Sequence, residues 1–253
     1  MRSALALVLI SGTLLAGVAA QTTSTKTSEI HQLYITDQSE RGVTIDGVKP
    51  AEIAPEQMSA NDAERRKRAH QLLNQGALQS GADFHDAAFI FQHGDTPDDY
   101  LLAHLLAMSA VAKGDGRGRW IAAATLDRYL QSIGQPQVFG TQFLTRGYLD
   151  FLNQIRAKQG AQEASKNQPQ QRADADTKTK SQVDNSHKAT GSAAEQDAKK
   201  SDEYLQEPYN PSMISDALRL QYCVPTVIEQ KERLAELNGG KPAPRRPIPG
   251  CTK

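Results

Sequence analysis

The sequence predicts an all-α fold: a small array of antiparallel helical hairpins with a disordered insertion and a disulfide-stapled C-terminal tail. Three features favour this fold. Helix-start signals, in which a hydroxyl residue precedes an acidic one, recur along the central part of the chain. Glycines that end helices follow at intervals of about twenty residues, as in short antiparallel hairpins. Apolar residues between these signals repeat with helical periodicity.

Residues 1–20 are predicted to form a signal peptide. An apolar run from Ala4 to Val18 follows a basic residue, and small residues precede Gln21, which is typical of a secretory signal cleaved after Ala20. The alternative is an uncleaved anchor. The run is shorter than the roughly 20 residues of a membrane-spanning helix, and no other stretch approaches that length. We therefore expect a periplasmic or secreted protein with no integral membrane span after signal cleavage.

Residues 21–157 are predicted to form the helical domain. In each start signal a hydroxyl would cap free backbone N–H groups, and an acid three residues later would complement the helix dipole. We expect four short helices, with starts at Ser59 and Asp62, Ser80 and Asp83, and Thr96 and Asp99, and with stops at Gly76, Gly94, Gly114 and Gly134.

Apolar spacing indicates which faces of these helices are buried. Phe84, Ala87, Ala88 and Phe91 fall at positions i, i+3, i+4 and i+7, which predicts one buried stripe. The next helix, residues 101–112, is apolar nearly all round, and we expect it to be the most buried of the four.

The charges of the chain exclude one class of partner. Its 29 Lys and Arg residues balance its 29 Asp and Glu residues, so no net field attracts nucleic acid, and we expect no nucleic acid partner. A local basic run occupies residues 64–68 of an amphipathic helix, where a solvated face is favoured over a phosphate site.

Two segments follow the helical domain. Residues 158–202 are rich in Lys, Asp, Ser, Thr and Gln with almost no large apolar residue, so they cannot bury enough surface to fold, and we predict a disordered, low-complexity insertion. Residues 203–253 become apolar again, notably from 208 to 225, and are predicted to dock on the helical domain.

The two cysteines, Cys223 and Cys251, lie in this C-terminal segment. A disulfide is the default for an exported chain, and closing a loop of this size contributes about 3–4 kcal/mol in the chain-entropy model. The sequence contains no C-x-x-C motif and no third ligand near them, so we expect neither a metal nor a cofactor.

Four motifs occur in a fixed order. They are D-Q-x-x-R from Asp37, Q-H-x-D from Gln92, a D-R pair at Asp127, and a closing G-x-x-Q-x-F-G-T-Q from Gly134 to Gln142. In this order they resemble a widespread bacterial domain family of unknown function. That resemblance implies an all-helical domain and carries no established activity. The chain differs from the family pattern by its long insertion, its cysteine-bearing tail and the lack of an aromatic-proline step near residue 76.

A weaker resemblance is to tetratricopeptide and Sel1-like helical repeats, which also stack antiparallel helices. It rests on small residues that permit close helix packing, namely Ala103, Ala107, Ala110, Ala123 and Ala124.

Polar residues among the apolar positions form the candidate site. Helix ends at Gly94 and Gly134 would bring them to one end of the bundle, where Arg128 is predicted to pair with Asp95 or Asp37. The candidate cluster comprises His85, Gln92, His93, Asp95, Asp127, Arg128, Gln135, Gln137, Thr141 and Gln142.

Three interpretations of this cluster are open. The side chains could satisfy orphan backbone groups at helix ends and in the closing loop. They could line a ligand-binding pocket. They could also be catalytic, with Asp127 orienting His93 or His85 to take a proton from water. No nucleophile motif, P-loop or metalloprotease spacing is present in the sequence.

The sequence thus predicts an exported helical binding protein of the bacterial envelope, whose partner would be an envelope protein, a peptide or a glycan. The alternative is a periplasmic hydrolase that uses a His/Asp cluster. A hydrolase requires a histidine within hydrogen-bond reach of Asp127 in an open cleft, whereas a closed and satisfied network favours binding.

Overall fold

The computed structural model describes residues 28–154, 157, 201–242 and 247–251. The predicted signal peptide lies outside these residues, as does all of the predicted insertion except residues 201 and 202. The described part of the chain is mainly helical, which confirms the predicted all-α class. Its helices are α1 (Glu29–Glu40), α2 (Pro55–Asn74), α3 (Gly81–Phe91), α4 (Pro97–Ala112), α5 (Gly118–Ser132), α8 (Asp216–Gln221) and α9 (Val227–Leu237).

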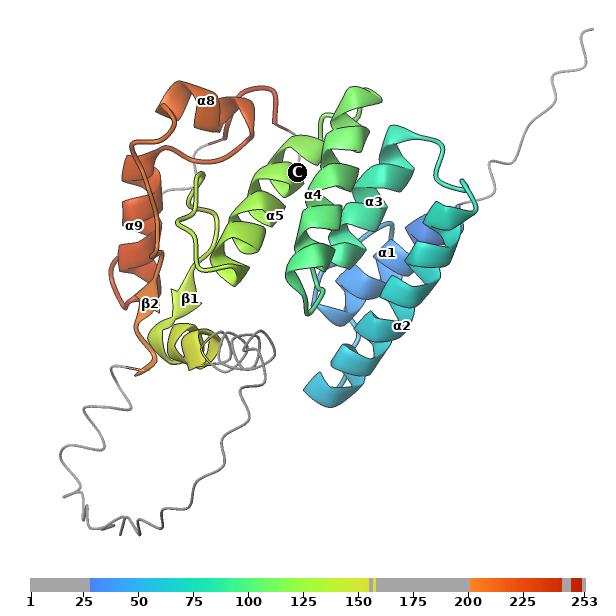
Figure 1. Cartoon of the computed structure of the whole chain (residues 1–253), viewed down its shortest axis with the longest axis horizontal. Coiled ribbons are helices and arrows are strands. Elements are labelled where there is room, and N and C mark those ends of the chain that lie inside the picture. The colour runs from blue at the N-terminus through green and yellow to red at the C-terminus, as the bar shows by residue number, and fades with distance from the viewer. Residues whose placement is uncertain (1–27, 155–156, 158–200, 243–246, 252–253) are drawn as a thin grey trace, which may run out of the picture.

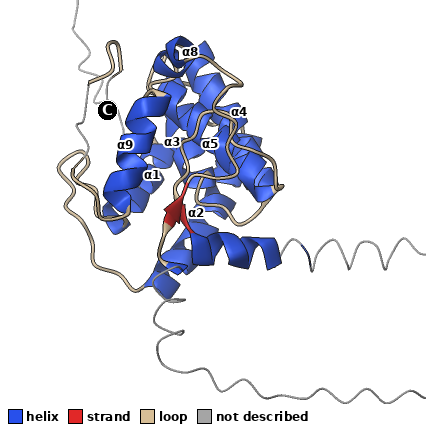
Figure 2. Ribbon diagram, turned by 90° about the vertical axis from the view of Figure 1, so that its left-hand side faces the viewer, coloured by secondary structure: helices blue, strands red, loops and turns tan. Residues whose placement is uncertain are grey.

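The helices form a row that the C-terminal segment extends. Helices α3, α4 and α5 lie side by side, α1 and α2 pack on the α3 side, and α8 and α9 lie beyond α5 (Figure 1). A small antiparallel sheet joins the two parts, with β1 (Leu144–Thr145) paired to β2 (Tyr204–Leu205) (Figure 2). A helical segment over residues 146–154 follows β1.

Two of the predicted helix starts are confirmed. Ser80 accepts a hydrogen bond from the Asp83 backbone N–H, and the Asp83 carboxylate accepts one from the Ser80 backbone N–H. Thr96 and Asp99 form the same reciprocal capping box at the start of α4. Each box satisfies two backbone donors that the first helical turn leaves free.

The third start was misplaced, and one helix was missed. Helix α2 begins at Pro55, one turn before Ser59, because the fixed φ of proline suits the first turn and its missing N–H costs nothing there. Helix α1 was not predicted, since it is polar along most of its length and buries only Ile30, Tyr34 and Ile35 among its apolar residues.

The main core is formed by buried residues of α1 to α5 and of the loop that joins α2 to α3. Helix α4 packs on both neighbours through small residues such as Ala103 and Ala107, which are 0% exposed. Its other face is open, with Leu105 at 56% and Met108 at 39% exposed. The expectation that residues 101–112 form the most buried helix is therefore wrong, because apolar character on every face does not ensure a neighbour on every face.

The C-terminal segment contacts the helical domain through a second core. Val224 and Phe139 are buried there with Ala123 of α5, and the rings of Phe139 and Tyr222 lie 4.9 Å apart.

The predicted disulfide is confirmed, with an S–S distance of 2.03 Å between Cys223 and Cys251. None of the helices in the described ranges is long and apolar enough to cross a membrane.

Candidate functional site

The predicted polar cluster separates into distinct groups. Asp127, Gln137, Thr141 and Gln142 lie in one network at the closing loop, and His93 and His85 belong to two others. Gln135 is exposed on the surface and joins none of them through its side chain in the described residues. The convergence of His93, Asp127 and Gln135 at one site is therefore wrong.

Asp127 fastens the closing loop, residues 137–142, to helix α5. Its carboxylate is 0% exposed and accepts hydrogen bonds from the backbone N–H groups of Val138 (2.8 Å), Phe139 (2.9 Å) and Thr141 (2.9 Å). The Thr141 hydroxyl donates a fourth at 2.8 Å. Burial raises the pKa of Asp127 above its ordinary value, and these four bonds oppose that shift. The role of this carboxylate is to hold a loop.

Four glutamines, which we call the amide network, tie the loop to the C-terminal segment: Gln137, Gln142, Gln206 and Gln230. The Gln137 amide accepts from the Gln142 backbone N–H at 2.9 Å and donates to the backbone oxygens of Gln142 and Gln206. Gln206 Nε2 donates to Gln230 Oε1 at 2.8 Å, and Gln230 Nε2 donates to the Phe139 carbonyl at 2.8 Å. All four side chains are buried, and their amides bond to backbone groups and, between Gln206 and Gln230, to each other.

A glycine makes this close packing possible. Gly140 has φ of +76°, and a Cβ there would lie 2.6 Å from Tyr209 Cζ and 2.7 Å from Gln206 Nε2. The glycine of the F-G-T-Q sequence is thus explained, because Gly140 adopts a left-handed conformation between Phe139 and Thr141, whose backbone N–H groups both bond Asp127.

The second group, which we call the ionic network, joins α1, α2 and the end of α3. It consists of Asp37, Glu40, Arg41, Asp62, Arg65 and His93. Asp37, 1% exposed, accepts from Arg41 Nη1 at 2.8 Å, and its Oδ1 lies 3.1 Å from His93 Nδ1. Burial lowers the pKa of His93, against the opposing effect of Asp37.

The basic run of residues 64–68 is not simply a solvated face. Arg65 is 5% exposed and donates to Glu40 at 2.7 Å and to Asp62 at 2.5 Å. Arg66 donates to the His93 carbonyl at 2.7 Å and pairs with Asp95. Helical periodicity turns these two side chains toward α1 and α3, whereas Lys67 remains exposed.

Three side chains of the ionic network have the spacing of metal ligands. Ligand atoms of Asp37, Asp62 and His93 lie within 4.8 Å of one another. Arg41 already binds both carboxylates, at 2.8 Å and 2.6 Å, and Arg65 binds Asp62 from a second side. Since two guanidinium groups neutralise these acids, the arrangement functions as an ion-pair network.

The third group surrounds Asp86, which is 1% exposed. Its carboxylate oxygens lie 2.8 Å from His85 Nδ1 and 2.6 Å from His31 Nδ1, while His31 Nε2 lies 2.8 Å from Asp46. Burial alone would lower the pKa of His31, but hydrogen bonds to Asp86 and Asp46 outweigh it and raise the pKa. His31 could not be predicted as a member of this group, since no local pattern links it to an acid 55 residues away.

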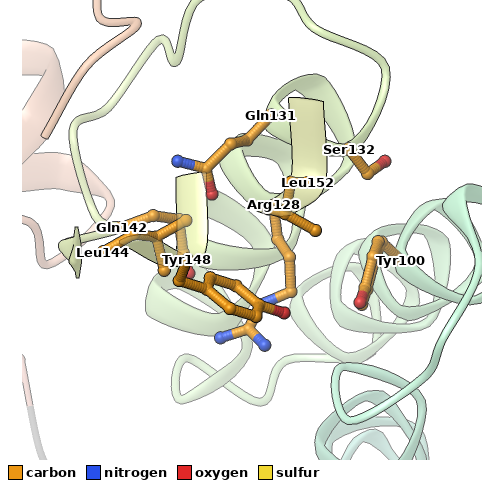
Figure 3. Close-up of a pocket in the computed structure, with 8 residues that line it drawn as sticks. All are labelled: Tyr100, Arg128, Gln131, Ser132, Gln142, Leu144, Tyr148 and Leu152. Carbon is orange, nitrogen blue, oxygen red and sulfur yellow. The ribbon is translucent and has the colours of Figure 1, made fainter. Parts of the chain in front are cut away.

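Arg128 differs from the other predicted site residues. It lines a cavity of about 80 Å³ between α5, the start of α4 and the helical segment 146–154 (Figure 3). We call this the Arg128 pocket, and its walls are Tyr100, Arg128, Gln131, Ser132, Gln142, Leu144, Tyr148 and Leu152.

Neither carboxylate predicted to pair with Arg128 does so, because Asp95 binds Arg66 and Asp37 binds Arg41. Arg128 Nη1 donates instead to the Gln92 carbonyl at 3.2 Å, and the guanidinium lies 5.8 Å from the centroid of the Tyr100 ring. Burial lowers the pKa of Arg128.

The chain matches no protein-family profile, no curated protein and no solved structure.

Proposed function

We propose that this chain is an exported interaction protein of the bacterial envelope and that its helical domain binds its partner at the Arg128 pocket. The observation that carries the proposal is an arginine on the wall of a cavity with no carboxylate partner among the described residues. In the other buried clusters, Arg41, Arg65 and Arg219 each pair with a carboxylate.

Two features support the location. The N-terminal sequence has the order of a secretory signal, and the Cys223–Cys251 disulfide is typical of proteins that fold in an oxidising compartment. The resemblance to a bacterial domain family of unknown function is compatible with this location and adds no activity.

The hydrolase alternative has less support. Its general base requires a histidine hydrogen-bonded to Asp127, but every hydrogen bond described for Asp127 comes from the closing loop. His93 contacts Asp37 and His85 contacts Asp86. A carboxylate saturated by backbone donors and removed from solvent cannot orient a base for catalysis.

Site-specific photocrosslinking in living cells tests the proposal. A photoreactive residue replaces Tyr148, which is 48% exposed on the rim of the pocket. A matched variant carries the same residue at Lys67, an exposed side chain on α2, a helix that does not line the pocket.

We expect one discrete adduct from position 148 in the envelope fraction, which mass spectrometry identifies, and none from position 67. Fractionation of the same cells checks export. Equal adducts from both positions, or a chain retained in the cytoplasm, would contradict the proposal.

A further inference from the structure

We infer that the Arg128 pocket binds a single carboxylate group carried on a short apolar substituent. This inference rests on the proposed function and names the chemistry of its site. One observation carries it: a guanidinium on the pocket wall without a counter-charge among the described residues.

The guanidinium is exceptional in its own protein. Four other largely buried arginines each pair with a carboxylate: Arg41 with Asp37, Arg65 with Glu40, Arg66 with Asp95, and Arg219 with Asp216. Arg128 makes one hydrogen bond to a neutral carbonyl and is paired with no acid in the described ranges. An arginine fork has five N–H donors, so most of those of Arg128 are left for a ligand.

The fork of Arg128 presents paired donors, which suit the two oxygens of a carboxylate, each of which accepts more than one hydrogen bond. Gln131 also lines the pocket, but its Nε2 is fully buried and points away from the Arg128 guanidinium (Figure 3).

The size and remaining walls of the pocket restrict what carries the carboxylate. A volume of about 80 Å³ lies between the roughly 10–15 Å³ that one water needs and the roughly 150 Å³ of a cavity that holds benzene. Leu144, Leu152 and the Tyr148 ring supply apolar contacts (Figure 3). The single positive charge of Arg128 balances a monoanion better than a phosphate dianion. The apolar walls can contact a few carbon atoms attached to the carboxylate.

Free small acids and the C-terminal residue of a peptide both present this chemistry. Tyr148 and Phe151 are 48% and 53% exposed, with ring centroids 6.2 Å apart, so a longer ligand could extend over them. The test therefore includes both sources, together with inorganic phosphate.

The exported chain, with its disulfide intact, is titrated by calorimetry with isovalerate and with isovaleramide, which has the same shape and no charge. A second pair is an acetylated tripeptide ending in leucine with a free or an amidated C-terminus. We expect each acid to bind at least tenfold more tightly than its amide, and phosphate to bind more weakly than isovalerate. If the acids and amides bind equally, if no acid binds at millimolar concentration, or if phosphate binds best, the inference is wrong.

Variants locate the site. We expect Arg128→Gln to weaken acid binding at least tenfold, while Arg68→Gln on α2 leaves it unchanged. Unchanged binding in Arg128→Gln would overturn the assignment. If that variant fails to fold, the comparison of acid and amide binding to the unmodified protein still tests whether the pocket selects a carboxylate.

The two proposals can fail separately. A discrete adduct at position 148 without selectivity for acids would support the proposed interaction role and contradict carboxylate binding. Selectivity for acids without an adduct would support a site for small carboxylic acids and contradict binding of an envelope partner at this pocket.

Discussion

The ionic network and the amide network both bury polar side chains between helices, but they use different chemistry. In the ionic network, acids and guanidinium groups from α1 and α2 meet as charged pairs around Asp37 and Arg65. In the amide network, neutral glutamines bridge the closing loop to β2 and α9. Charged pairs respond to pH and salt and tolerate small shifts, whereas amides require exact placement of each donor and acceptor.

The largest effect is expected where the amide network is packed most closely. In Gly140→Ala the new Cβ would collide with Tyr209 and Gln206, and the residue would keep an unfavourable φ of +76°. Overpacking and left-handed strain together should lower the free energy of unfolding by about 3 kcal/mol or more.

Urea denaturation measures this change, with Gly76→Ala as the matched control. Gly76 also has a positive φ, of +66°, but nothing lies within 4 Å of its Cβ position. The control should cost only about 1 kcal/mol. Equal losses in both variants would show that packing around Gly140 is unimportant.

The next largest effect is expected at Asp127. Asp127→Ala leaves the N–H groups of Val138, Phe139 and Thr141 without their acceptor and should destabilise the fold by about 2–3 kcal/mol. Asp127→Asn keeps the shape but places an amide donor against those N–H groups, so it should not restore stability. Thermal unfolding of both variants checks this; full stability in Asp127→Asn would argue against the four-donor arrangement.

A smaller effect is expected from the ionic network. Arg65→Gln removes the partner of Glu40 and Asp62 but leaves Arg41 to neutralise Asp37 and Asp62, so we expect a loss of about 2 kcal/mol. High salt should reduce the difference from the parent protein, unlike that of Gly140→Ala. Arg68→Gln, whose pair with Glu29 is exposed, should change little. A salt-independent loss in Arg65→Gln would mean that its packing, rather than its charge, matters.

The smallest effect concerns pH. Because the pKa of His31 is raised in the folded state, its stabilising contribution is fully present below about pH 6.5 and is lost as pH rises through the folded pKa. His93 has a lowered pKa, so its neutral form stabilises the fold above about pH 6.5 and that contribution is lost as pH falls. Replacing each by Gln should therefore change the slope of stability against pH in opposite directions between pH 5 and 8. Slopes of the same sign would be inconsistent with these two environments.

Signals within a few residues of one another in the sequence predicted the features that depend on neighbouring residues, such as helix caps. The capping boxes at Ser80 and Thr96 and the disulfide followed from residues close in sequence or unique in kind. The start of α2 was displaced because Pro55 is a stronger signal than Ser59.

The networks themselves could not be predicted, because their partners are distant in sequence. Gln137 meets Gln206 across 69 residues and the Phe139 carbonyl meets Gln230 across 91, and no pattern in either segment encodes that register. The predicted candidate site contains Gln137 and Gln142 but neither Gln206 nor Gln230. It also combines groups that the structure separates, since helix ends alone do not determine which face each side chain occupies.

The β1–β2 pair and the amide network have a consequence for a chain cut once between residues 158 and 200. Such a cut creates two fragments, and Cys223 and Cys251 both belong to the second, so no covalent bond links the halves. We expect the fragments to remain associated, because the Leu144–Leu205 pairing, the glutamine contacts and the core around Phe139 all join the two halves. A nicked molecule should therefore elute as one species under native conditions and separate in denaturant without any reductant. Separately expressed halves could then reassemble, which would make this protein a split scaffold divided at its own insertion.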